Sequence, residues 1–183
     1  MEEPARAPRS PLRSVFAGIL ATLAMDVGGG LLRALHLTQG LPPHLIGRWF
    51  VTLVREPKVV TTIADVPAVP GELAFALAGH YCIGIALTVA FLATLAATGR
   101  RGERRFAFVA ALVFGLLTNL LPWLWMFPAM GYGRFGRAAP AEWALTTTSF
   151  MNHLVFAIGL ACATRWLRLV GAGTGIRPTG VRS

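Results

Sequence analysis

The sequence predicts an all-α membrane protein, a bundle of four transmembrane helices with a short interfacial helix in the first outer loop. The first observation is composition: 55% of the 183 residues are hydrophobic, 14% are charged and the mean hydropathy is +0.60. A soluble domain has about 25% charged residues. The second observation is that the apolar residues gather in four long segments. Because every backbone amide must be satisfied in lipid and four strands cannot close a barrel, these segments are predicted to be helices.

Each of the four segments is long enough to cross a bilayer, which takes about 20 apolar residues. The predicted spans cover about residues 14–37, 72–98, 106–127 and 143–169. Together they form a transmembrane domain over residues 14–170. Residues 1–13 are predicted to be a basic tail, and the stretch 171–183, rich in glycine, threonine and arginine, a disordered tail. The sequence therefore predicts one membrane domain between two short tails.

The arginines predict the topology. The N-terminal tail, the loop "GRRGERR" after the second span and the C-terminal region hold most of the basic residues. Since cytoplasmic loops are enriched in Arg and Lys, both termini are predicted to be cytoplasmic, in the bacterial cytoplasmic (inner) membrane. The formal charge of +9 forms no clustered basic face, so the lipid bilayer is the expected partner and nucleic acid is not.

The first outer loop contains an amphipathic segment, "HLIGRWFVTLVRE", which follows Pro42 and Pro43. Its apolar residues recur with a 3.6-residue period, and a proline pair suits the start of a helix. The segment is too short to span, so we predict a helix in the outer interface with its apolar face toward the lipid. The second outer loop, "FPAMGYGRFGRAAP", is predicted to be irregular and tightly turning because of its glycines.

Four polar residues interrupt the apolar spans, one on each: Asp26, His80, Asn119 and His153. An ionisable group at a helix centre costs about 2.5–3.5 kcal/mol, so it usually faces the bundle interior and has a partner. The helical rise of 1.5 Å per residue puts all four at about 12–16 Å from the outer ends of their spans. The sequence therefore predicts one polar site in the outer half of the membrane, with Thr22 and Asn152 in the same network.

Three interpretations of this site are open. Asp26, His80 and His153 could hold a divalent metal, Zn, Fe or Mn, because imidazole and carboxylate suit these ions. In an enzyme the metal would activate water or a substrate oxygen, Arg48 would neutralise an anionic group, and Tyr81 or Asn152 would orient it. A haem between the two histidines is disfavoured because Asp26 would then have no role.

The second interpretation is a relay of protons or cations through Asp26 and the histidines. Four short helices make a small conduit, so this version predicts a homo-oligomer. The third is a structural network in which Asp26 is hydrogen-bonded to a histidine and only fixes helix packing. The sequence leaves open whether the protein is an enzyme.

Several segments together resemble an uncharacterised bacterial membrane family, domain of unknown function family 2938. They are "GILATLAMD", "IGRW", "GELAFALAGHYCIGIAL", "FPAMGYG" and "NHLVFAIGL", and the resemblance covers about residues 15–165. The family pattern falls here on Asp26, Gly47, Arg48, Trp49, His80, Tyr81, Pro128, Met130, Gly131, Gly133 and His153. The resemblance supports the topology and these residues and implies no reaction. We expect the glycine-rich second loop to cap the polar site.

Overall fold

The structure is a computed structural model that describes residues 11–55, 62–100, 102–141 and 143–173. Most of the N-terminal tail and of the C-terminal tail lies outside the described residues. Within the described part of the chain every regular element is a helix and none is a strand. The all-helical prediction is therefore confirmed.

Four helices are long and apolar enough to cross a membrane. They are α1 (Pro11–Ala34), α3 (Glu72–Ala97), a third span over Arg104–Ala129, and α6 (Ala144–Gly173). This confirms four candidate spans and makes the chain a multi-pass membrane protein by length and composition.

The third span is not one uniform helix. Its regular part, α4 (Arg104–Leu117), is followed by a turn, a π-helical segment η2 (Pro122–Met126) and the short α5 (Phe127–Ala129). Pro122 has no N–H to donate, so an unbroken i to i−4 ladder cannot pass through it. Wider π turns of this kind often occur at functional sites.

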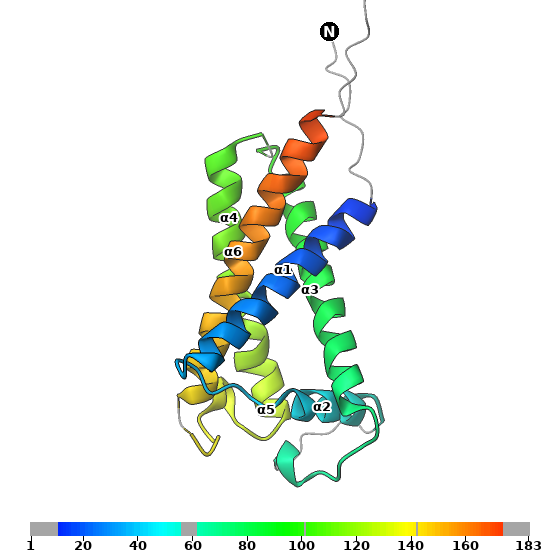
Figure 1. The fold of residues 1–183 in the computed structure, drawn as a ribbon, viewed down its shortest axis with the longest axis vertical. Coiled ribbons are helices and arrows are strands. Elements are labelled where there is room, and N and C mark those ends of the chain that lie inside the picture. The colour runs from blue at the N-terminus through cyan, green and yellow to red at the C-terminus, as the bar shows by residue number, and fades with distance from the viewer. Residues whose placement is uncertain (1–10, 56–61, 101, 142, 174–183) are drawn as a thin grey trace, which may run out of the picture.

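The elements alternate between the two ends of the bundle (Figure 1). The start of α1, the α3–α4 connection and the end of α6 lie at one end, and α2 (Pro43–Arg55) and α5 lie at the other, called the α2 end below. Helix α1 crosses the bundle obliquely and packs against both α3 and α6, and α4 packs against α6. Helices α3 and α4 make little contact with each other. The bundle is therefore least tightly closed between α3 and α4.

The half of the bundle away from α2 is filled by an apolar cluster. Its large members are Phe91, Leu92, Leu95, Phe156, Leu160 and Leu167, and alanines complete it. Small residues allow this close packing: a Cβ on Gly115 would lie 2.5 Å from Ala157 Cα, and one on Gly18 would lie 2.7 Å from Ile85 Cα. This half of the molecule is an apolar core.

Helix α2 exists as predicted, but its packing differs from the prediction. Arg48 is buried and forms an ion pair with Glu72 at the start of α3, Nε to Oε1 2.6 Å. Its Nη1 donates to the carbonyl oxygens of Ala64 and Val66 at 3.3 and 2.7 Å. The hydrogen bond to Glu72 raises the pKa of Arg48 above its ordinary value. These bonds explain the burial, since a buried cation needs a partner and satisfied donors.

The apolar face of α2 covers protein. Leu45 and Trp49 are buried in a second cluster with Ile63, Phe127 and Met130. Gly47 lets α2 touch α3, because a Cβ on Gly47 would lie only 1.7 Å from the carbonyl oxygen of Glu72. Helix α2 is therefore part of the folded bundle.

Candidate functional site

Asp26 on α1 is hydrogen-bonded to two neighbouring residues of α3. His80 Nε2 lies 2.9 Å from Asp26 Oδ1, and the Tyr81 hydroxyl donates to Asp26 Oδ2 at 2.9 Å. The side chains of Asp26 and His80 are 38% and 33% exposed. Asp26 thus has the partners that a carboxylate in an apolar helix needs, and its bonds join α1 to α3.

Close approach of α1 and α3 makes this contact possible. One turn before Asp26, Thr22 is buried and its hydroxyl donates to the carbonyl of Gly18. A Cβ on Gly84 would collide with this hydroxyl, at 2.0 Å. Glycine at position 84 therefore sets the distance between the helices that carry Asp26 and His80.

His153 belongs to a second hydrogen-bonded group, between α6 and the third span. Its Nδ1 lies 2.7 Å from Thr118 Oγ1, at the point where α4 ends. One residue further, Asn119 is buried and its Oδ1 accepts a hydrogen bond from Ser149 Oγ at 2.9 Å. The structure therefore divides the predicted network into an Asp26 group and a His153 group.

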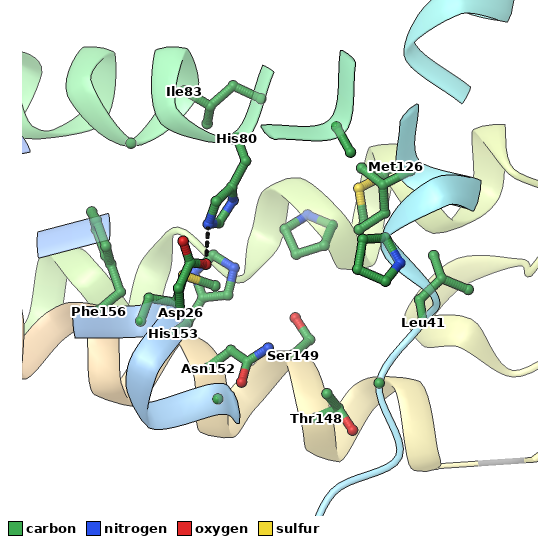
Figure 2. A pocket seen from close by; sticks show the side chains of 18 of the residues that line it. Asp26, Leu41, His80, Ile83, Met126, Thr148, Ser149, Asn152, His153 and Phe156 are labelled. Atoms are coloured by element: carbon green, nitrogen blue, oxygen red, sulfur yellow. Dashed lines mark hydrogen bonds and ion pairs between the residues drawn. The ribbon is translucent and has the colours of Figure 1, made fainter. Parts of the chain in front are cut away.

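Both groups meet at one cavity of about 510 Å³. Figure 2 shows Asp26, His80, His153, Asn152 and Ser149 reaching toward the same space. The remaining wall is mostly apolar and comes from α2, α3, η2 and α6, including Ile46, Trp49, Phe50, Leu77, Ile83, Leu121, Trp125, Met126 and Leu145. The site is thus an apolar cavity with polar groups concentrated on one side.

The metal hypothesis gains no support from this geometry. Among the described residues, no group of three or more His, Cys, Asp and Glu side chains could hold a metal ion. The reason is that Asp26 and His80 bond to each other, while His153 bonds to Thr118. Tyr81 is held by Asp26. Arg48 is paired with Glu72 and is absent from the cavity lining, so the structure gives no support to a role for it opposite an anionic substrate group.

The second outer loop contributes one residue, Phe127, to the cavity lining, which gives little support to its expected role as a cap. Pro128, Met130, Gly131 and Gly133 are not among the residues that line the cavity. Met130 is fully buried, and its carbonyl accepts a hydrogen bond from the N–H of Ile63 in η1 (Ile63–Asp65). Gly131 and Gly133 have φ of 84° and 68°, which only glycine adopts freely. This loop therefore mainly shapes the α2 end, and the lining of the cavity there comes from α2, from Phe127 and from Thr38, Gly40 and Leu41.

Two lining residues carry buried polar atoms without a hydrogen-bond partner: Thr148 Oγ1 and Asn152 Oδ1, one turn apart on α6. A Cβ on Gly29 would lie 2.7 Å from Asn152 Oδ1, so this glycine makes room for the amide. Sequence reasoning missed Thr148. Arg33, which lines the cavity on α1, lies on the helix face of Asp26, as its spacing in the sequence predicts. The run "TTTS" at 146–149, inside an apolar helix, is the signal that could have found Thr148.

The comparisons with known proteins place the chain in a family. The family model described as protein of unknown function (DUF2938) matches residues 15–167. The chain belongs to this family. No curated protein and no solved structure matches it. The resemblance seen in the sequence is confirmed, and the segment matched by DUF2938 contains every residue that lines the cavity.

Proposed function

We propose that this DUF2938 protein binds an amphiphilic molecule of the membrane in the cavity beside Asp26. The cavity itself carries the proposal. At about 510 Å³ it has the size and the composition, apolar walls with a few polar groups, that are typical of small-molecule sites. A molecule with an apolar chain and a polar group would satisfy both kinds of wall.

The residues around the cavity favour entry from the lipid. Leu77 on α3 and Leu121 and Trp125 on the third span line the cavity and are also 49%, 42% and 50% exposed. They lie on the two helices that make little contact with each other. An apolar chain in the surrounding bilayer therefore meets an apolar opening at this position.

The same packing argues for binding rather than conduction. Beyond Phe156 the bundle is filled by the apolar cluster of α1, α3, α4 and α6. Among the described residues, the buried polar side chains of that half are threonines such as Thr88 and Thr164, whereas Asp26, His80 and His153, the ionisable groups that a proton or cation relay would use, lie at the cavity. The bonds from Asp26 to His80 and Tyr81 join two helices, so they also fit a packing role.

We further propose that the α2 end faces the outside of the bacterial inner membrane. The support is the bias of arginines toward the other end, in the loop between α3 and α4 and in both tails. Both termini would then be cytoplasmic. The cavity would face the outer leaflet. Labelling of single cysteines in intact cells, introduced at Gly102 and at the exposed Ala138 after Cys82 and Cys162 are replaced by alanine, tests this orientation.

Binding is tested by quenching of tryptophan fluorescence in the purified, full-length protein. Trp49 lines the cavity but is only 3% exposed, so a chain in bulk detergent cannot reach its ring. Dibrominated stearic acid and the monoacylglycerol with the same chain are the probes. Because Trp125 also lines the cavity, the measurement is made in a Trp125→Phe background. We expect saturable quenching there that is absent when Trp49→Phe is added.

A variant that fills the cavity supplies the decisive comparison. Gly30 lines the cavity, and nothing lies within 4 Å of where its Cβ would be. Gly30→Leu therefore adds a side chain without a collision at the Cβ. It is expected to abolish the saturable quenching. Gly102→Leu, at an equally open position in the α3–α4 loop, is the matched control. Equal quenching in both variants would refute binding in this cavity.

A further inference from the structure

We infer that the cavity binds a single-chain amphiphile with an acidic headgroup, which pairs with Arg33. This inference rests on the proposed function and specifies its ligand. Arg33 lies in the last turn of α1 and lines the cavity at the α2 end. An arginine side chain at this depth supplies a cation to the headgroup while its stem stays in apolar surroundings.

Arg33 is the one arginine among the described residues that lines the cavity, and it has no acidic partner. Arg48 is paired with Glu72, and Arg100 with Glu103. The polar contact of Arg33 is one hydrogen bond from Nη2 to the carbonyl oxygen of Gly40, at 3.3 Å. Among the described residues no carboxylate forms an ion pair with it. Four of its five N–H donors are thus left for an anion.

Thr148 adds a second donor at the same place. Its Cγ2 lies 3.4 Å from where a Cβ on Gly40 would be, so Thr148 and Arg33 both adjoin Gly40. The Thr148 hydroxyl is buried and has no partner. Threonine in a helix occupies two χ1 rotamers, so one rotation presents this hydroxyl to an acid oxygen beside the guanidinium. The guanidinium of Arg33 and the hydroxyl of Thr148 would then both donate hydrogen bonds to one headgroup.

The position of Asp26 fixes the orientation of such a ligand. Asp26 and Arg33 are seven residues apart, about 10 Å along the helix axis, on one face of α1. The carboxylate of Asp26 repels an acid in the deep part of the cavity, and Arg33 attracts one at the α2 end. The chain can then lie among Ile46 and Trp49 of α2 and Leu145 of α6, which are apolar residues of the cavity lining.

The size of the cavity favours one acyl chain over two. A volume of about 510 Å³ lies within the range that encloses drug-sized molecules. A phospholipid with two chains is larger than this. We therefore commit to a free fatty acid or an equivalent single-chain acid as the occupant.

The test compares three dibrominated probes with the same chain: stearic acid, its monoacylglycerol and phosphatidylglycerol. Saturable quenching of Trp49 is measured in the full-length protein at a pH where the acid is ionised. Charge-assisted hydrogen bonds lead us to expect that the acid binds about tenfold more tightly than the monoacylglycerol. Arg33→Gln should remove this preference and Arg33→Lys should retain part of it. Arg55→Gln, at an exposed arginine outside the cavity lining, should leave it unchanged.

Two results would overturn the inference while leaving the proposed function intact. One is equal binding of acid and monoacylglycerol, or a preference that survives Arg33→Gln. The other is tighter binding of phosphatidylglycerol than of the acid. If no probe gives quenching that Gly30→Leu abolishes, the proposed function itself fails.

Discussion

Replacing Gly47 by alanine tests how α2 is attached to the bundle. A Cβ at this position would lie 1.7 Å from the carbonyl oxygen of Glu72 and 2.5 Å from its carbon. Real Cβ contacts are not shorter than about 3.0 Å, so α2 has to move away from α3 by about 1.3 Å. The colliding atoms are backbone, and no side-chain rotation relieves them. The movement also lengthens the 2.6 Å contact between Arg48 and Glu72.

Two effects of opposite sign decide how much Gly47→Ala changes the free energy of unfolding. Alanine is favoured over glycine in a helix by about 1 kcal/mol, whereas overpacking costs about 1–3 kcal/mol. Because this collision is with backbone, we take the upper value and expect Gly47→Ala to lose about 2 kcal/mol of unfolding free energy. Gly30→Ala, which meets open space, is the matched control and should gain up to about 1 kcal/mol.

Denaturant unfolding of the two variants in detergent micelles, followed by circular dichroism, measures both values. If Gly47→Ala is as stable as Gly30→Ala, α2 does not pack on α3 as described. The same variant should lose saturable quenching of Trp49, because α2 supplies part of the cavity wall.

Three further substitutions separate satisfied from unsatisfied polar groups, and each is measured by the same unfolding assay. Tyr81→Phe removes one of the two hydrogen bonds to Asp26 and should lower the free energy of unfolding by about 1.5 kcal/mol. This is the low end for a charged acceptor, because Asp26 is 38% exposed. An unchanged stability would mean that the hydroxyl bonds elsewhere. Ser149→Ala leaves the buried Asn119 Oδ1 without its donor and should cost about 1–3 kcal/mol; a smaller cost would mean that another donor replaces it. Thr148→Val removes a buried hydroxyl that has no partner, so the ligand-free protein should be unchanged or more stable by about 1 kcal/mol; a clear loss would reveal a hydrogen bond absent from this structure.

The sequence predicted most of the fold because membrane helices leave a strong signal. Long apolar segments and their flanking arginines predicted the four spans. The 3.6-residue period predicted the helix that the structure has at 43–55. The irregular third span was missed, although Pro122 stands within it, because proline is tolerated in membrane helices when other groups satisfy the backbone. The burial of Arg48 was missed because its partner, Glu72, is 24 residues away and helical period alone suggests an exposed face.

The candidate site was predicted less completely. The distance of each residue from the outer end of its span predicted that Asp26, His80 and His153 lie at a similar depth in the membrane. In the structure all three line one cavity. Depth cannot give the rotation of each helix, so it could not separate the Asp26 group from the His153 group. Thr148 was missed because it does not stand out in its run of threonines, and Arg33, on the helix face of Asp26, was given no role. Their position became apparent only when the segment around Gly40 was found between them.

Mass spectrometry of the intact protein, released from mild detergent, tests the central claim most directly. We predict that wild-type protein and Gly102→Leu each carry one bound single-chain amphiphile, and that Gly30→Leu carries none. Absence of any bound molecule in the wild type, or the same bound mass in all three proteins, would contradict the account.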